Sequence, residues 1–212
     1  MLELLFQSPI TFVILALLLI FSIGIHEFSH ALIADRLGDP TPRAQGRLTI
    51  NPLAHLDPIG MILIVVIGFG WGKPVVYDPY NLNNPHRDSA YIALAGPVSS
   101  LLTAIVFALL VHIVPVATPI VQILMYAVRL NVMLALFNFI PVYPLDGFRI
   151  VSGLLPAQSR EDWNQLSHYG IIILILLIFP LFGNSSVLSL LISPSISFIT
   201  SLLLPHGIAG IL

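Results

Sequence analysis

The sequence predicts an all-α integral membrane protein with about five transmembrane helices, a re-entrant segment and a short β-hairpin at the membrane surface. Of its 212 residues, 57% are hydrophobic and 8% are charged, whereas a soluble domain carries about 25% charged residues. Long stretches without Asp, Glu, Lys or Arg alternate with short charged segments. This length favours one integral-membrane domain, residues 1–212, with no sizeable module outside the bilayer.

The first charge-free stretch runs from Leu4 to Ile25, and its helical pattern continues to about Arg36. A helix over 8–36 is long enough to cross a hydrocarbon core of about 30 Å at about 1.5 Å per residue. The chain begins Met-Leu-Glu and lacks the positive region of a cleavable signal peptide, so we expect this helix to be retained.

Two further charge-free stretches each predict a pair of helices. Pro115 and Pro119 divide the second stretch into helices at about 89–114 and 118–139. The residues 183–186 divide the last stretch into helices at about 164–182 and 187–204. We therefore expect a core over about 8–155 followed by two accessory spans within about 164–204.

Residues 38–88 have a different composition. The segment Arg43–Ile50 suits a short β-hairpin at the membrane surface, with Gly46 at its turn. The apolar run from Ile59 to Phe69 has only about a dozen residues, a length more often re-entrant than spanning. The Pro- and Asn-rich residues 73–87 predict a loop.

Basic residues in short loops predict the orientation. If residues 53–72 enter the membrane and return, seven of the eight basic residues fall on one side, which is then cytoplasmic: Arg36, Arg43, Arg47, Lys73, Arg87, Arg149 and Arg160. The N-terminus is expected outside and the C-terminus in the cytoplasm.

Composition also excludes several function classes. A chain without cysteine has no disulfide, thiolate nucleophile or Cys-based metal site, so any metal must be held by His, Asp or Glu. A net charge of −2 with eight scattered basic residues provides no phosphate-binding stripe, so we expect no nucleic-acid partner. The bilayer is the expected partner, and no oligomeric state is predicted.

His26 and His30 flank Glu27 in the run His-Glu-Phe-Ser-His near the end of the first predicted span. Positions i and i+4 share one face of a helix, so both imidazoles can bind one tetrahedral zinc ion. Glu27 is placed to act as a general base toward water. The alternatives are a polar kink or a haem-like histidine pair, but ionisable groups within a span are costly and usually functional.

Asp146 is our expected third protein ligand, because two histidines leave a catalytic zinc site one protein ligand short. It ends a run in which Pro141 and Pro144 break the third predicted span, and Gly147 permits a left-handed turn. A broken helix at membrane depth normally lines a buried or wet cavity. The alternative is a helix-capping or turn aspartate at the interface.

These motifs resemble those of the site-2 proteases, the intramembrane zinc metalloproteases of family M50. The resemblance rests on the run 26–30, on Ala95-Gly96-Pro97-Val98-Ser99, and on the run from Asn138 to Gly147. It implies one Zn²⁺ per chain, held by His26, His30 and Asp146, with Glu27 as catalytic base. Many members carry a PDZ or CBS domain, and here we expect a compact form without one. We expect it in the cell membrane, and the pattern of basic residues places the active site toward the cytoplasm.

Two further residues are possible auxiliaries. His55 lies in a segment similar to one in compact members of the family, and is either an extra zinc ligand or a hydrogen-bonding interfacial histidine. Asn138 is a possible donor to the oxyanion, although Phe139 departs from the family's usual spelling after the asparagine.

The sequence therefore predicts an intramembrane zinc metalloprotease that hydrolyses peptide bonds within or near transmembrane segments of other proteins. The alternative is a zinc-binding pseudoenzyme or a divalent-ion transporter. A substrate helix must unwind before cleavage, and pairing with a strand edge stabilises the unwound backbone. We expect the Arg43–Ile50 hairpin to supply that edge beside the zinc, the alternative being a surface loop.

Overall fold

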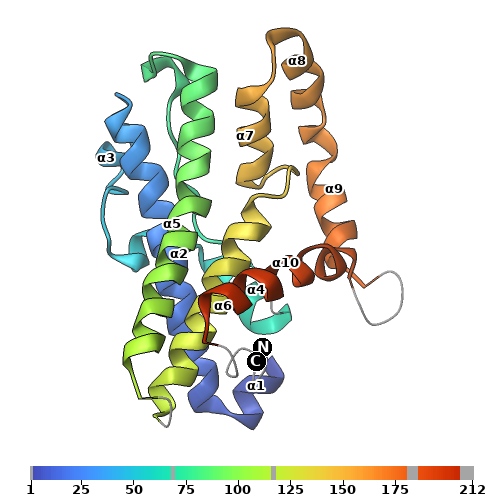
Figure 1. The fold of residues 1–212 in the computed structure, drawn as a ribbon. Helices are drawn as coiled ribbons and strands as arrows, with labels where there is room; N and C mark the ends of the chain where they lie inside the picture. The colour runs from blue at the N-terminus through green and yellow to red at the C-terminus, as the bar shows by residue number, and fades with distance from the viewer. Residues whose placement is uncertain (1, 68–69, 116–117, 181–185, 206–212) are drawn as a thin grey trace. The chain divides into compact units, whose positions relative to one another are not determined.

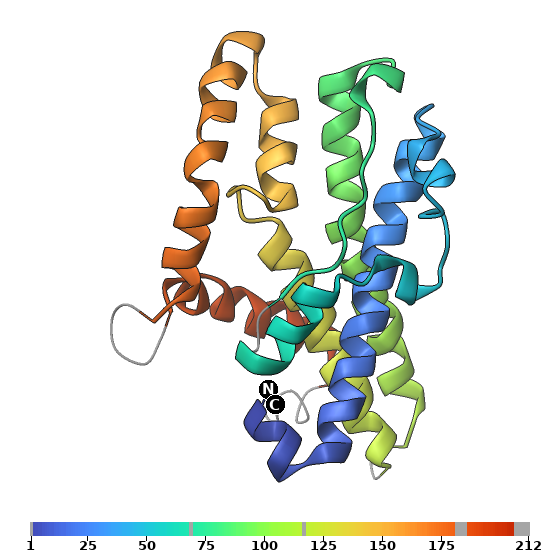
Figure 2. The same cartoon turned by 180° about the vertical axis from the view of Figure 1, so that it is seen from behind.

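The computed structural model describes residues 2–67, 70–115, 118–180 and 186–205 (Figures 1 and 2). Over these ranges the backbone is mainly helical and forms no β-strand, although Leu56 and Gly72 make an isolated antiparallel bridge. The chain divides into two compact units, Met1–Asn83 and Asn84–Leu212.

The first unit is organised along one long helix, α2 (Pro9–Arg36), which matches the predicted first span. Its 28 residues extend for about 42 Å, longer than a hydrocarbon core of about 30 Å. The helix ends before Gly38, whose φ of 106° lies in the left-handed region that favours glycine. Its other helical segments are short: α1 (Leu2–Gln7), α3 (Thr41–Ala44), η1 (Pro52–His55), α4 (Pro58–Ile67) and η2 (Pro79–Asn81).

The short helix α4 belongs to a loop that closes on itself. Its 10 residues extend for about 15 Å, half of a hydrocarbon core. The chain then returns, because the Lys73 amide donates to the His55 carbonyl at 2.8 Å, next to the Leu56–Gly72 bridge. This is the geometry that a re-entrant segment requires. Of the residues in that prediction, 68–69 lie outside the described part of the chain.

The predicted β-hairpin over Arg43–Ile50 is wrong. Helix α3 occupies Thr41–Ala44, and residues 45–50 form turns and bends. The physical cause is local, because the Asp39 carboxylate accepts the Thr41 amide at 3.1 Å and so starts a helical turn. Gly46 does occupy a turn, with φ 69°. Without a strand in this segment, our expectation that it pairs with an extended substrate is withdrawn.

The second unit consists of α5 (Pro85–Ile113), α6 (Pro119–Asn138), α7 (Asp146–Leu154), α8 (Ala157–Gln165), α9 (Ser167–Ile178) and α10 (Val187–Leu203). Helices α5 and α6 pack as an antiparallel pair, and α10 crosses α6 (Figures 1 and 2). Alanine and β-branched residues, with Met125 and Leu204, form the buried core of these three helices: Ala104, Ala108, Val111, Val121, Met125, Val128, Val132, Ile196 and Leu204.

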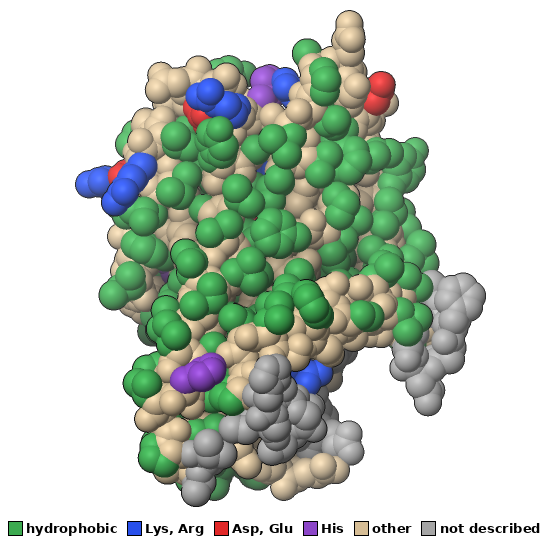
Figure 3. Space-filling view, in the orientation of Figure 1, with side chains coloured by type: hydrophobic (Ala, Val, Ile, Leu, Met, Phe, Trp, Pro, Cys, Tyr) green, Lys and Arg blue, Asp and Glu red, His purple; other side chains and the backbone are tan. Residues whose placement is uncertain are grey.

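Three helices, α2, α5 and α6, are long and apolar enough to cross a membrane, while α9 and α10 are shorter apolar helices. Apolar side chains cover most of the face seen in Figure 3. Several of them are largely exposed, including Leu109, Ile172 and Phe198. A surface this apolar suits lipid rather than water, and the protein is a membrane protein. The predicted turn at 183–186 lies mostly outside the described residues.

Candidate metal centre

Helix α2 places His26, Glu27 and His30 within one turn near its C-terminal half. The two imidazoles are 4% and 7% exposed, and their ring centroids lie 4.7 Å apart with the planes at 82°. Their candidate ligand nitrogens lie within 4.8 Å of one another. Two buried imidazoles converging from one helical face form a donor pair that fits zinc.

The Glu27 carboxylate is held in place by main chain from outside the helix. Its Oε2 atom accepts a hydrogen bond from the Val75 amide at 3.0 Å. This bond engages one of the two carboxylate oxygens. A backbone donor fixes the direction of the carboxylate more firmly than a mobile side chain does.

Val75 belongs to an extended segment, residues 72–78, that we call the strap. At its start, Gly72 lies against α2, since a Cβ there would be 2.6 Å from the Ile23 side chain and 3.0 Å from the His55 carbonyl oxygen. Only glycine permits this approach, which brings the following amides alongside Glu27.

Arg47 holds the beginning of the strap. Its side chain is 4% exposed, and its Nη2 donates to the carbonyls of Lys73 and Pro74 at 3.0 Å each. Its Nη1 donates to the carbonyl of Ala54. One buried guanidinium therefore satisfies three carbonyls of irregular backbone and joins the strap to the segment before α4.

Asp39 holds the other end of the strap. Its carboxylate is fully buried and accepts hydrogen bonds from the Asp78 amide and the Asn81 side chain, each at 2.8 Å, and from the Thr41 hydroxyl at 2.6 Å. Burial opposes ionisation, but the hydrogen bonds from Thr41, Asn81 and Asp78 outweigh it and lower the pKa of Asp39 below its ordinary value.

His55 lies in the same unit and is fully buried. Its Nε2 donates to the Thr49 carbonyl oxygen at 2.9 Å, because a carbonyl oxygen can only accept. Nδ1 has no hydrogen-bond partner among the described residues. A carbonyl partner that fixes the tautomer also occurs behind metal-bound histidines, so the geometry leaves both sequence interpretations of His55 open.

Asp146 and Asn138 lie in the second unit, on either side of a break between two helices. As predicted, the helix ends before the prolines: α6 stops at Asn138 and α7 starts at Asp146. Gly147 is helical and not left-handed, because the positive-φ glycines are Gly38 and Gly46. Its role is close packing, since a Cβ would lie 2.3 Å from the Phe139 carbonyl oxygen.

The Asn138 amide is directed along its own helix. Its Nδ2 donates to the Leu134 carbonyl at 3.0 Å, which engages one of the two amide hydrogens. An oxyanion role for Asn138 therefore stays a prediction.

Sequence reasoning missed the strap and Arg47. From the sequence, residues 73–87 are interpreted as a loop and Arg47 as part of a hairpin. The hydrogen bonds that hold the strap join a side chain to main-chain atoms, and main-chain atoms leave no pattern in the sequence. The one available signal was a charged residue, Arg47, close to apolar segments, which in a membrane protein calls for a partner.

Comparison with known proteins gives an independent view. The family model described as "Peptidase family M50" matches residues 114–180. The chain is 40% identical over 177 residues to "Putative zinc metalloprotease YwhC" of Bacillus subtilis, a match that covers 79% of this chain and 81% of that protein.

More distant similarities fall in the same class. The chain is 27% identical over 167 residues to "Putative zinc metalloprotease Rip2" of Mycolicibacterium smegmatis, covering 75% of this chain and 64% of that protein. It is 25% identical over 152 residues to "Zinc metalloprotease MJ0392" of Methanocaldococcus jannaschii, covering 72% of this chain and 37% of that protein. No solved structure matches the chain.

Proposed function

Because the chain belongs to peptidase family M50 and is a zinc metalloprotease, we propose that it cleaves peptide bonds within or near transmembrane segments of other membrane proteins. The observation that carries this proposal is the buried pair His26 and His30, flanking an oriented Glu27 on an apolar helix long enough to cross a membrane. A protease with its metal ligands on such a helix acts on chains that share the bilayer.

We propose that His26, His30 and Asp146 hold one zinc ion per chain. Two imidazoles and a carboxylate are a known donor set of catalytic zinc sites, which keep one further position for water or substrate. Asp146 supports this assignment because it opens α7 directly after a break with two prolines, at Pro141 and Pro144. Bound zinc supplies a Lewis acid that polarises the scissile carbonyl and makes water a usable nucleophile near neutral pH.

Glu27 acts as the general base. With Oε2 engaged by the Val75 amide, Oε1 accepts the proton from the attacking water and delivers it to the leaving amine. Asn138 is proposed to donate its remaining amide hydrogen to the developing oxyanion, and His55 to offer the lone pair of Nδ1 toward the reaction site.

The membrane arrangement is part of the proposal. We propose that α2, α5 and α6 cross the membrane and that the shorter apolar helices α9 and α10 lie within it, with the N-terminus outside and the seven clustered basic residues in the cytoplasm. The chain has no cysteine, so single cysteines can be introduced and labelled. A cysteine at Thr118 should react with an impermeant thiol reagent from outside, and one at Ser159 should not. Labelling of Ser159→Cys from outside would overturn this arrangement.

The competing classes, a pseudoenzyme or an ion transporter, are not favoured. The relatives are named as zinc metalloproteases, and Glu27, the residue a pseudoenzyme dispenses with, is present and oriented.

The test compares membrane proteomes of cells that produce wild-type protein or Glu27→Gln. The variant should accumulate an uncleaved membrane protein while it keeps its zinc, because the amide removes the base and leaves the proposed ligands. Glu161→Gln is the matched control, since Glu161 is an exposed glutamate on α8. Identical substrate profiles for wild type and Glu27→Gln would refute the proposed reaction.

A further inference from the structure

The second unit has an open surface cavity of about 510 Å³ between the start of α5 and the connection from α7 to α8. Its polar lining comes from Asn84, His86, Arg87 and Arg160, and its apolar lining includes Tyr91 and Leu154. The proposed proteolytic site uses none of these residues.

Close helix packing forms the floor of this cavity. Gly153 on α7 lies against α5, since a Cβ there would be 2.4 Å from the Ala90 Cβ and 2.6 Å from the His86 carbonyl oxygen. The two helices therefore meet at Gly153, and the larger side chains on either side line a hollow above the contact.

Arg160 presents a guanidinium that is already fixed in place. Its Nε donates to the Ser152 carbonyl at 3.0 Å and its Nη2 to the Leu155 carbonyl at 2.7 Å. These bonds orient the planar group at the cavity wall and leave the two Nη1 hydrogens and the second Nη2 hydrogen as donors. An anion binding here does not have to immobilise a flexible side chain, which favours affinity.

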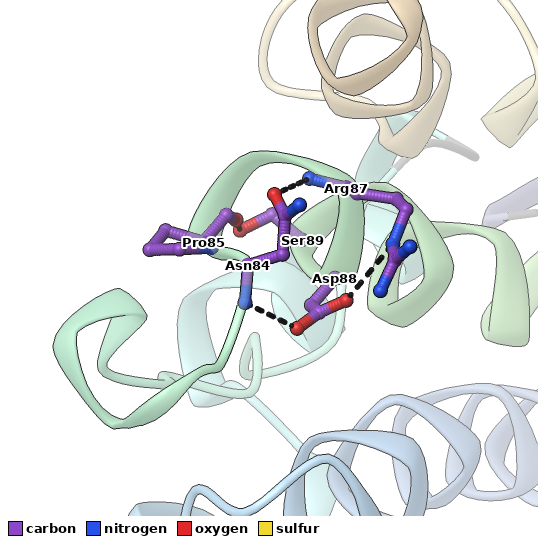
Figure 4. A network of polar contacts seen from close by, with 5 residues as sticks. All are labelled: Asn84, Pro85, Arg87, Asp88 and Ser89. Atoms are coloured by element: carbon purple, nitrogen blue, oxygen red, sulfur yellow. Dashed lines mark hydrogen bonds and ion pairs between the residues drawn. The ribbon is translucent and has the colours of Figure 1, made fainter.

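Arg87 supplies a second cation. Figure 4 shows its side chain extending from the first turn of α5, with its Nε 3.5 Å from the Asp88 Oδ1. The other Asp88 oxygen accepts the Asn84 amide at 2.8 Å, so the buried carboxylate lies behind Arg87 and anchors it. The Arg87 guanidinium also stacks over the Tyr91 ring at 5.8 Å.

The lining is therefore cationic on balance. Asp88 offsets one arginine and does not line the cavity, and the acidic residues Glu161 and Asp162 on α8 do not line it either. Arg160, the His86 side chain and the outer edge of Arg87 remain as donors. Guanidinium groups match phosphate in geometry, and two of them at one cavity favour a phosphate ligand.

The position along α5 places the cavity at the membrane surface. From Ser89 to Ile113 the helix carries no formal charge, a stretch of about 37 Å that exceeds the hydrocarbon core of about 30 Å. Arg87 and Asp88 precede this stretch, and Tyr91 is half-exposed, as aromatic residues of the interfacial belt are. The polar helix α8 continues the other wall away from the apolar region.

We propose that this cavity binds the headgroup phosphate of one anionic phospholipid, with Arg87 and Arg160 as its ligands and the acyl chains leaving past Tyr91 and the exposed Leu154. A free phosphate ion shares the charged contacts but has no use for the apolar exit. Basic pockets at the ends of membrane helices are suited to anionic headgroups, so a lipid is the occupant that uses the whole lining.

The experiment uses the full chain, purified with zinc in nonionic detergent and freed of native lipid. Short-chain phosphatidylglycerol, short-chain phosphatidylcholine and inorganic phosphate are titrated separately, and bound ligand is counted by native mass spectrometry. Wild type should bind one phosphatidylglycerol per chain. Arg87→Gln/Arg160→Gln should bind it about 30-fold more weakly, since each surface cation contributes about 1 kcal/mol toward an anionic lipid.

The matched control is Arg36→Gln/Arg43→Gln, which removes two exposed arginines that do not line the cavity and should bind like wild type. If the double cavity variant fails to fold, Arg87→Gln alone should still bind about fivefold more weakly, because Arg87 is 59% exposed and bonds no distant backbone. Equal affinity for wild type and a folded cavity variant would overturn the proposal. So would inorganic phosphate or phosphatidylcholine binding as tightly as phosphatidylglycerol.

Discussion

In the first unit, Arg47 and Glu27 bond to main-chain atoms far away in sequence, whereas within α5 and α6 several polar side chains bond to carbonyls one turn back in their own helix. Arg47 reaches the carbonyls of Lys73 and Pro74, 26 and 27 residues away. In contrast, Thr103 and Asn131 bond to carbonyls four residues back.

The difference follows from what the backbone needs. A helix satisfies its own amides and carbonyls, so α5 and α6 can pack with small and apolar side chains. Irregular backbone in an apolar protein has no such internal partners, and each unsatisfied group costs several kcal/mol in lipid. The strap therefore depends on Glu27, Arg47 and Asp39. Replacing a buried polar side chain with an apolar one should lower the free energy of unfolding strongly in the first unit and only slightly within α5 and α6.

The largest expected effect concerns the metal, because each unit is proposed to supply part of the donor set. His26→Ala in the first unit and Asp146→Ala in the second should each weaken zinc binding by more than about 100-fold, since each removes a direct ligand. Glu27→Gln should bind zinc normally. Zinc content and affinity are measured on purified protein by metal analysis and chelator competition.

Asp162→Ala is the matched control, an exposed aspartate in the same unit as Asp146. Full zinc occupancy in Asp146→Ala, with proteolysis intact, would show that the second unit supplies no ligand and would confine the metal to the first.

The next effect tests the strap. Arg47→Ala leaves three carbonyls without their buried charged donor and should lower the free energy of unfolding by about 3–5 kcal/mol. Faster hydrogen exchange at the Val75 amide should accompany the loss, because the strap is no longer held against Glu27. The measurements are denaturant unfolding in detergent and exchange mass spectrometry.

Arg43→Ala is the comparison for this variant. Arg43 is a largely exposed arginine in a surface ion pair with Asp35, and such pairs contribute about 0–1 kcal/mol. If Arg47→Ala and Arg43→Ala lower the free energy of unfolding equally, the long-range hydrogen bonds of Arg47 stabilise the fold no more than a surface ion pair does.

Asp39 provides a pH-dependent version of the same test. Its pKa is lowered in the folded state, so its carboxylate stabilises the fold above the ordinary aspartate pKa of about 3.9, and this stabilisation is lost as pH falls through the lowered value. Asp39→Asn should cost about 1–3 kcal/mol at pH 7 and flatten the acid limb of the stability profile. Unfolding measured from pH 7 to pH 3 checks this, with Asp162→Asn as a surface control. If the acid limb of the stability profile is unchanged in Asp39→Asn, the Asp39 carboxylate does not stabilise the strap.

These regions also show how far the sequence alone predicts the molecule. The helix bearing His26, Glu27 and His30 and the break before Asp146 were predictable because each is local: a four-residue spacing in one case and two prolines in the other. The short length of the apolar run predicted a segment too short to span, and α4 has 10 residues.

The hairpin failed and the strap was missed for one common reason. Alternating side chains around Gly46 suggested strands, but a strand needs a partner, and Asp39 instead starts a helical turn at Thr41. The strap is defined by main-chain amides and carbonyls, which have no side-chain signature. Its supports, Arg47 and Asp39, bond to partners 26 to 42 residues away in sequence, a separation for which sequence spacing gives no rule.

The smallest expected effect comes from a pair of threonines matched across the two regions. Thr41 donates its hydroxyl to the buried Asp39 carboxylate at 2.6 Å, and Thr103 donates to the Ser99 carbonyl of its own helix at 2.8 Å. Thr41→Val removes a charge-assisted bond and should cost about 1–2 kcal/mol. Thr103→Val removes a second bond to a carbonyl already used by the helix and should change stability by less than about 0.5 kcal/mol. Both variants conserve shape, so unfolding free energies measured side by side isolate the hydroxyl. A loss at Thr103 equal to or larger than that at Thr41 would break the distinction between irregular and helical backbone on which the comparison of the two units depends.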